Sequence, residues 1–361
     1  MKKALLSIAA IAIAAITISS CKKNDSPSPV GIDDKVSAQL INNFFSKYAS
    51  QEEKFTLDAS VGGTVTLSSG TKITFPAGAF KTSGGAAISG SVSIFAKDIL
   101  KASDMILSNK PTLTADGRML ESYGEIIVKA EQGGNVLQLN PEQQKPVMVQ
   151  VPIGGANANG AARDIPMWDG DTTITQTISG YNHENVLTSV TQQFNVNKGV
   201  AWIQIPGSGV SSGATTIFPL NALGEWRNCD ALYNDSRPKT TVLGYFGDKF
   251  NEETGNNYMG QDPTMLFFKT AGTNTLVKLY NAIFMPAPGK EGMLSYQNSI
   301  PVGQEGTFLA ISAKNGKFYA EMRDVTIPAP AAGKTYAAFT FNMNEVSESQ
   351  LLSLINQMST K

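Results

Sequence analysis

The chain of 361 residues carries 29 basic and 30 acidic side chains, and its formal net charge is −1 at pH 7. This balance gives no basis for nucleic-acid binding, because phosphate recognition requires clustered Lys and Arg. One His and two Cys are too few for an ordinary zinc site, so we expect no metal and no cofactor. The length suits two or three domains of about 100–200 residues each.

The N-terminus has the layout of a secretory signal. Met1-Lys2-Lys3 precedes an apolar run over residues 4–18, which is shorter than the ~20 residues that span a bilayer, and Ser19-Ser20-Cys21 follow. With Cys in place of Ala at the end of this segment, the layout resembles a bacterial lipoprotein signal, in which the Cys becomes the first residue of the mature chain. The resemblance implies removal of residues 1–20, lipidation of Cys21 with palmitate-type chains, and an outer-membrane lipoprotein that contacts the membrane through this lipid. The alternative is a plain secretory signal with an incidental Cys.

A polar tether and a short helix are expected next. Residues 21–32 are rich in Lys, Ser and Pro and lack the apolar side chains needed for ordering. Residues 33–50 place two acids ahead of an apolar stripe with helical spacing, formed by Val36, Leu40, Ile41, Phe44, Phe45 and Tyr48. The stripe suits a partner or a membrane surface, but docking on the protein's own domain is the favoured interpretation.

The remaining sequence predicts a mainly β fold of tandem antiparallel β-sandwich modules. Short runs rich in Val, Ile, Thr and Phe alternate with turn residues at spacings near ten residues. A Gly/Ala/Asn stretch near residue 155 predicts a boundary, which gives modules over 54–155, 163–235 and 236–361. The last module ends in an amphipathic helix, where Ser347 and Gln350 form a possible capping box.

Two resemblances extend this interpretation. Gly62-Gly63-Thr64-Val65-Thr66-Leu67 and the following Gly70–Phe80 resemble the opening of ZU5-like β-sandwich modules. Gly117–Gly124, Gly224–Asp230 and Ile300–Thr307 look like passages of uncharacterised surface lipoproteins of Gram-negative bacteria. The first resemblance implies an interaction domain. The self-cleavage of some ZU5 modules is not implied, because the only His is outside the matching region.

One Cys/His pair is available for nucleophilic catalysis. Cys229 and His183 are its members, and Asp230 is a possible orienting acid. The favoured alternative places Cys229 with Trp226 in a core, as an unreactive thiol. If Cys21 carries lipid, Cys229 has no partner for an intrachain disulfide.

Carboxylates offer two further candidate sites, each with a simpler alternative. Asp169-Gly170-Asp171 would supply a few of the oxygens of a Ca²⁺ site, but a turn with solvated acids is favoured. Asp116, Glu121 and Glu125 would suit a glycosidase, although surface carboxylates of this kind are common.

Aromatic residues raise the possibility of glycan binding. The candidates Trp168, Tyr181, Trp202, Tyr245 and Tyr258 lie mostly in β-patterned segments, where core packing is the favoured role. The polar segment Asn251–Pro263 is the best candidate recognition loop, with Asn256, Asn257 and Tyr258 as possible ligand-binding residues.

Together these patterns predict a lipid-anchored cell-envelope protein with a non-catalytic binding or scaffolding role, and with an envelope protein or a glycan as partner. A glycan-binding accessory lipoprotein is the first alternative, and a hydrolase that uses Cys229 and His183 is the second.

Overall fold

The computed structural model has the expected mainly β fold with helices near both ends of the described chain. The part of the chain that it describes comprises residues 34–143, 145–152, 163–172, 174–177, 180–181, 187–188, 193–196, 199–206, 210–212, 215–256, 262–283 and 286–361. Residues 32–361 belong to one compact unit.

Two antiparallel sheets form what we call the first sandwich. Its seven-stranded sheet has the order β1 (Glu53–Asp58), β5 (Ser91–Ile99), β6 (Leu120–Gln132), β19 (Trp226–Leu232), β11 (Met167–Asp171) and β16 (Ala201–Gln204), with β7 (Asn135–Val136) beside β6. The facing sheet has the order β10 (Arg163–Ile165), β17 (Val210–Ser212), β18 (Thr215–Leu220), β9 (Val147–Pro152), β3 (Lys72–Phe75) and β2 (Gly63–Thr66).

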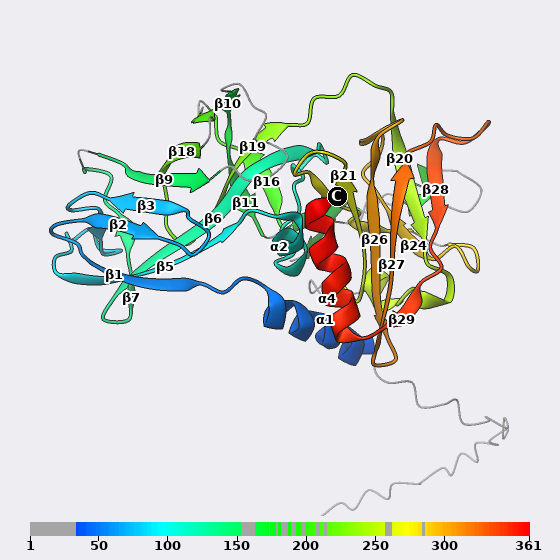
Figure 1. The fold of residues 1–361 in the computed structure, drawn as a ribbon, viewed down its shortest axis with the longest axis horizontal. Coiled ribbons are helices and arrows are strands. Elements are labelled where there is room, and N and C mark those ends of the chain that lie inside the picture. Colours follow the sequence, from blue (N-terminus) through cyan, green and yellow to red (C-terminus); the bar gives the residue numbers. More distant parts are fainter. Residues whose placement is uncertain are drawn as a thin grey trace, which may run out of the picture. The chain divides into compact units, whose positions relative to one another are not determined.

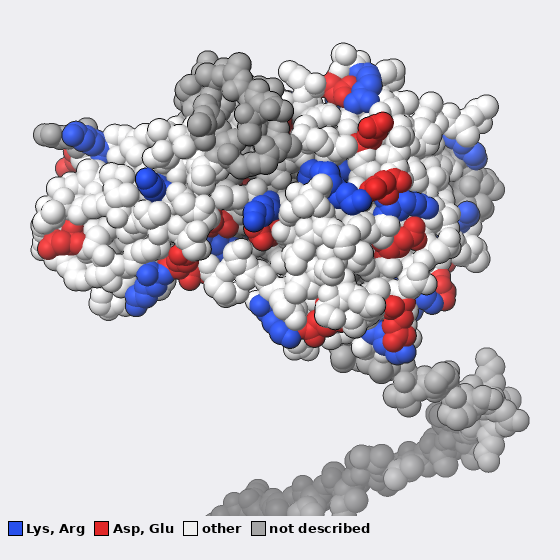
Figure 2. All heavy atoms as spheres, in the orientation of Figure 1, with Lys and Arg blue, Asp and Glu red and all other residues white. Residues whose placement is uncertain are grey.

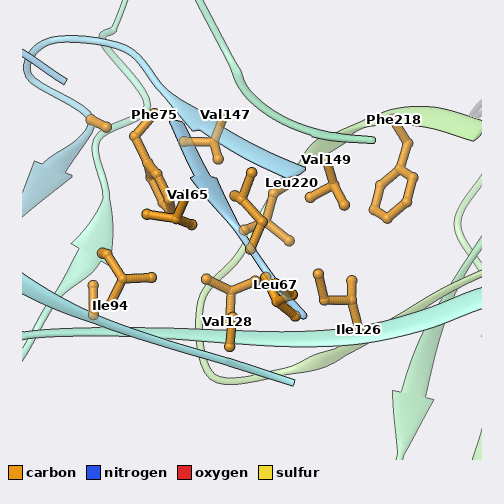
Figure 3. Packing of buried hydrophobic residues seen from close by; sticks show 14 of the residues in the cluster. Val65, Leu67, Phe75, Ile94, Ile126, Val128, Val147, Val149, Phe218 and Leu220 are labelled. Carbon is orange, nitrogen blue, oxygen red and sulfur yellow. The ribbon is translucent and has the colours of Figure 1, made fainter. Parts of the chain in front are cut away.

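The inner faces of these two sheets meet in an apolar core. Ile126 and Val128 of β6 and Ile94 of β5 face Val149 of β9 and Phe218 of β18, and all five side chains are buried (Figure 3). Alternate residues along each strand point into this core, as the period of two in the sequence predicts.

The first sandwich draws strands from both sides of the boundary predicted near residue 155. β6 pairs with β19, and β9 pairs with β18. Strands β10, β11 and β16–β19 of residues 163–235 therefore complete the sheets of residues 54–155, while two short strand pairs within residues 174–196 form separate two-stranded sheets. A Gly/Ala/Asn stretch marks a connection between strands, but its composition is the same whether the next strand joins an existing sheet or begins a new one.

A second sandwich is formed by the C-terminal residues. One sheet contains β23 (Asn281–Ala282), β24 (Gly292–Leu294), β20 (Lys239–Tyr245) and β25 (Ile300–Pro301), with β28 (Tyr336–Thr340) parallel to β20. The other has the order β22 (Leu276–Lys278), β21 (Thr264–Thr270), β26 (Glu305–Lys314), β27 (Lys317–Thr326) and β29 (Asn344–Val346). Buried side chains such as Val242, Phe268 and Phe308 fill the space between them. The parallel β20–β28 pair departs from the purely antiparallel expectation.

Three helices cover the other face of the β21–β26–β27 sheet: α1 (Asp34–Tyr48), α2 (Ala102–Leu107) and α4 (Glu348–Gln357) (Figure 1). β21 makes this possible because its residues are buried on both faces, with Leu266 and Phe268 in the sandwich and Met265 and Phe267 under the helices.

The apolar stripe of α1 docks on the protein itself, as favoured from the sequence. Phe44 is buried, and its ring centroid lies 5.4 Å from that of Phe318. The hydroxyl of Tyr48 donates a 2.7 Å hydrogen bond to Glu348 of α4. The capping box of α4 is also confirmed, because the Ser347 hydroxyl accepts from the Gln350 N–H and the Gln350 side chain accepts from the Ser347 N–H.

The remaining elements are short. They are the pairs β4 (Phe80–Lys81) with β8 (Gln138–Leu139), β12 (Ile174–Thr177) with β15 (Gln193–Val196) and β13 (Gly180–Tyr181) with β14 (Leu187–Thr188), the short helix α3 (Glu253–Asn256), and the 3₁₀ turns η2 (Gly247–Lys249) and η3 (Met358–Thr360).

Candidate functional site

Several of the residues singled out from the sequence lie outside the described part of the chain. These are Cys21, His183, Asn257 and Tyr258, and for Asn256 only the backbone is described, at the end of α3. The expected lipidation site, the Cys/His pair and the ligand-binding role of the 251–263 loop therefore stay predictions.

Cys229 is buried in the core of the first sandwich, which confirms the expected location of the thiol. It lies on β19 opposite Met167 of β11. Burial, with a smaller contribution from the negative charge of Asp230, raises the pKa of the Cys229 thiol well above its ordinary value. A thiol in this environment is protonated at neutral pH and has no contact with solvent, so it is a poor nucleophile.

The described tryptophans serve mainly as core residues. Trp168 and Trp202 are almost fully buried, and their indole N–H groups donate 2.9 Å hydrogen bonds to the carbonyls of Asp230 and Pro111. They pack with Leu120 and Val200, and with the partly buried Trp226. Trp168 and Trp202 therefore offer no exposed ring to a sugar, and core packing is confirmed for both.

The candidate carboxylates are separated by the structure into different environments. Asp169 lies within β11, so the predicted turn is wrong, although its side chain is 47% exposed and forms a 3.0 Å ion pair with Arg227. Asp116 is exposed and pairs with Arg118 at 2.8 Å. Glu125 is fully buried, so it is not a surface carboxylate. Among the described residues, no group of three or more His, Cys, Asp or Glu side chains is placed to hold a metal ion.

Glu125 belongs to a polar cluster on the outer face of the seven-stranded sheet, by which we mean the face directed away from the core of the first sandwich. Neither of its carboxylate oxygens hydrogen-bonds to a described residue. Burial and then the charge of Asp230 raise the pKa of Glu125 well above its ordinary value. Burial also raises the pKa of Asp230 to about 7, although Asn228 donates a 2.6 Å hydrogen bond to the Asp230 carboxylate.

Next to this cluster, the same outer face forms the floor of a cleft of about 840 Å³, which we call the outer-face cleft. The floor consists of Phe95 and Lys97 on β5, Ile127 and Lys129 on β6, and Trp226 on β19. Ile41 and Phe45 of α1 line another side, and Asn109 and Met265 also contribute. The volume is within the range of about 300–1,000 Å³ that small-molecule sites occupy.

Positive charge exceeds free negative charge in this cleft. Among the residues that the structure describes, Lys54, Lys97 and Lys129 line it together with two acids, Glu52 and Asp262. Glu52 forms an ion pair with Lys129, and Asp262 forms a buried 2.8 Å ion pair with Lys278. On the face drawn in Figure 2, acidic and basic side chains are interspersed, without a broad field of one sign.

Lys97 differs from the other two lysines of the outer-face cleft, because Lys129 is paired with Glu52 and the Lys54 ammonium lies over the Phe95 ring. The Lys97 ammonium group forms neither an ion pair nor a hydrogen bond with the residues that the structure describes. Burial lowers its pKa, while the more distant charges of Glu52, Asp104 and Glu125 act in the opposite direction. A partly buried cation without a close partner is a group that an anionic ligand would stabilise.

Sequence reasoning did not single out Lys97, Ile127 or Lys129. The available signal was the position of Ile127 and Lys129 in a predicted strand, at alternate places to Ile126 and Val128, whereas Lys97 follows directly after a strand predicted to end at Ala96. That alternation predicts that they share the face opposite the core, but it does not show that α1 returns to enclose part of this face.

No family model, curated protein or solved structure matches this chain. None of the helices in the described part of the chain is both long enough and apolar enough to cross a membrane.

Proposed function

We propose that this protein is a lipid-anchored component of the bacterial cell envelope with a non-catalytic binding role, and that it binds its ligand in the outer-face cleft. The observation that carries the binding role is the cleft floor, which consists of hydrogen-bonded neighbouring strands β5, β6 and β19. Side chains on paired strands are held at fixed spacing, which suits recognition without movement of the scaffold. The N-terminal sequence that ends at Cys21 supports the anchor.

The described residues favour this role over the two alternatives. A hydrolase that uses Cys229 would need substrate access to a thiol that is enclosed in the sandwich core. A glycan-binding platform would need exposed aromatic rings, whereas Trp168 and Trp202 are buried, and the half-buried rings of Trp226 and Tyr245 are each contacted by a lysine.

The anchor is tested by fractionation of cells that express the full chain with Cys21→Ser. We expect the variant to remain unprocessed or to appear in the soluble fraction, because a lipid-anchored protein owes its membrane affinity to its acyl chains, at about 0.8 kcal/mol per buried methylene. Cys229→Ala is the matched control and should stay in the envelope fraction. Firm envelope attachment of processed Cys21→Ser protein would contradict the anchor.

The binding role is tested by a photo-cross-linking amino acid at Ser46, which lies on α1 and lines the cleft. The control position is Lys317, an exposed residue on β27. In envelopes we expect a defined adduct from Ser46 and none from Lys317. Equal adducts from both positions, or adducts from Lys317 alone, would contradict binding in the cleft.

A further inference from the structure

The outer-face cleft combines an apolar wall with a cation that forms no ion pair, hydrogen bond or cation–π contact with the described residues. Lys97 provides the cation, and Ile41, Phe45, Ile127 and Met265 provide the wall. We propose, on the basis of the binding role proposed above, that the cleft binds a small organic carboxylic acid with an apolar body, whose carboxylate is held by the ammonium of Lys97.

The register of the strands places a second ammonium close to the first. Lys97 of β5 is paired with Ile127 of β6, and Phe95 is paired with Lys129. Lys97 and Lys129 are therefore diagonal neighbours on one face, a relation that separates residues by about 7–8 Å. Because long Lys side chains span such a distance, one carboxylate can lie between the two ammonium groups.

The two cations differ in how far they are already neutralised. Lys129 forms an ion pair with Glu52, whereas Lys97 has no such partner among the described residues. A carboxylate near Lys97 would therefore gain a charge-assisted interaction without displacing an existing one. This difference makes Lys97 the primary anion contact and Lys129 a secondary one.

The apolar wall determines the chemical character of the rest of the ligand, the part beyond the carboxylate. Ile41 and Phe45 on α1 and Ile127 on β6 are exposed by less than a tenth, yet all three line the cleft. A ligand with an apolar body would cover the small parts of these side chains that still contact solvent, and burial of apolar surface favours binding. A fully polar anion would gain nothing from this wall.

An acidic sugar fits the same cleft less well. Sugars stack on bare aromatic faces, but the Lys54 ammonium lies 5.3 Å from the Phe95 ring centroid, and the Lys110 ammonium lies 5.5 Å from that of Trp226. Each ring thus has one face occupied by a cation. With both rings contacted by cations in this way, the apolar side chains and Lys97 favour an apolar acid over an acidic sugar.

The test measures binding of trifluoromethylbenzoate to the purified full chain by fluorine NMR. Trifluoromethylbenzamide is the matched neutral probe, with the same apolar body and no charge. We expect the benzoate to bind with a Kd about tenfold lower than the benzamide, which corresponds to about 1.4 kcal/mol, because only the benzoate can form an ion pair with the partly buried Lys97. Equal Kd values, or no binding of the benzoate, would overturn the proposal.

Charge variants assign the contact to a residue. Lys97→Met should raise the Kd of the benzoate about tenfold and leave that of the benzamide unchanged, whereas Lys97→Arg should retain most of the affinity. Lys317→Met, on exposed β27, is the matched control and should change neither value. An unchanged Kd of the benzoate in Lys97→Met would overturn the assignment.

A steric variant serves as an independent test that leaves the lysines intact. Ser46→Trp adds a large side chain at an exposed position of α1 on the cleft, and it should weaken binding of both probes. Full affinity for both probes in Ser46→Trp would show that they bind elsewhere and would overturn the proposal.

A competitor tests the need for an apolar body. Oligogalacturonate supplies carboxylates without one, and we expect it not to displace the benzoate at equal carboxylate concentration. Displacement would overturn the requirement for an apolar body.

The experiments distinguish an error in the ligand class from an error in the proposed binding role or anchor. If the benzoate does not bind but the cross-linker at Ser46 still gives a defined envelope adduct, the ligand class is wrong and the binding role stands. If Cys21→Ser stays attached to the envelope but Lys97→Met weakens the benzoate, the anchor is wrong and the ligand class stands.

Discussion

The two faces of strand β6 are built from neighbouring residues and have opposite characters. Ile126 and Val128 are fully buried in the core of the first sandwich. Between and beside them, Glu125, Ile127 and Lys129 belong to the outer face, where a buried carboxylate, an aliphatic wall and an ammonium lie in sequence. The inner face stabilises the fold by burying apolar side chains. The outer face keeps charged side chains, which are not needed to form the core.

The two faces differ in the stability that buried charges cost them. Charges on the inner face would have no water and few partners, and the core positions of β5 and β6 are accordingly apolar: Val92, Ile94 and Ala96 on β5, and Tyr123, Ile126, Val128 and Ala130 on β6. On the outer face, Glu125 and Asp230 are both buried, and burial raises the pKa of each. Carboxylates in such positions lower stability unless they are protonated.

The largest expected effect concerns Asp230. Its pKa is about 7 in the native protein, whereas in the unfolded chain the carboxyl has its ordinary pKa of 3.8. As the pH rises from 3.8 to 7, the unfolded chain releases this proton while the native protein retains it, so the contribution of Asp230 to stability falls across that window and is constant above it. At about 1.4 kcal/mol per pKa unit, the loss is about 4 kcal/mol.

Asp230→Asn should remove this dependence. We expect the variant to be more stable than the unmodified protein at pH 8, by up to about 4 kcal/mol, and to differ little from it at pH 4. Urea unfolding at both pH values measures the difference. A variant that is equally destabilised at pH 4 and pH 8 would show that Asp230 acts through its hydrogen bonds alone, and that the cost of the outer face lies elsewhere.

The second prediction compares adjacent isoleucines on opposite faces. Ile126 is 0% exposed in the sandwich core, and Ile127 is 8% exposed beside the outer-face cleft. Ile126→Ala should lower the free energy of unfolding by about 3 kcal/mol, because it leaves a closed cavity. Ile127→Ala should cost less, since its removed atoms bordered a space that is already open.

Two measurements separate the faces. Denaturant unfolding gives the stability change of each variant, and fluorine NMR gives its Kd for trifluoromethylbenzoate. Ile127→Ala should weaken the benzoate, and Ile126→Ala should not. If Ile126→Ala weakened the benzoate more than Ile127→Ala did, the functional distinction between the faces would be lost.

The smallest expected effect concerns the ion pair at the edge of the cleft. Glu52 and Lys129 are both well exposed, with side-chain exposures of 35% and 41%. Glu52→Gln should therefore lower stability by no more than about 0.2–1 kcal/mol. It should also tighten benzoate binding, because Lys129 becomes free to contact the carboxylate. Thermal unfolding and the NMR titration check the two effects, and weaker benzoate binding would contradict the role given to Lys129.

Much of the fold was predictable because it depends on local patterns. The stripe from Leu40 to Tyr48 predicted α1, and the Ser347/Gln350 pair predicted the start of α4. The alternation around Ile126 and Val128 predicted a strand with one buried face. Burial of Cys229 was also foreseen, from its apolar surroundings.

The candidate site was not predictable to the same extent. Glu125 was interpreted as a surface carboxylate and Asp169 as part of a turn, and both interpretations were wrong. Each depends on a partner far along the chain: Glu125 lies opposite Asn228, and Asp169 lies opposite Arg227. The sequence around an acidic residue does not indicate which distant strand will pair with the strand that contains it.

The sequence by itself determined the mainly β class, the two terminal helices and the alternation of faces along each strand, because these follow from hydrogen bonding and burial within a few residues. The tertiary structure alone decided that residues 163–235 complete the first sandwich, and that α1 encloses a cleft over Lys97 and Ile127. The physical reason is that strand pairing and helix docking depend on the complementarity of surfaces far apart in the chain, and many pairings satisfy the same local pattern until the whole core is closed.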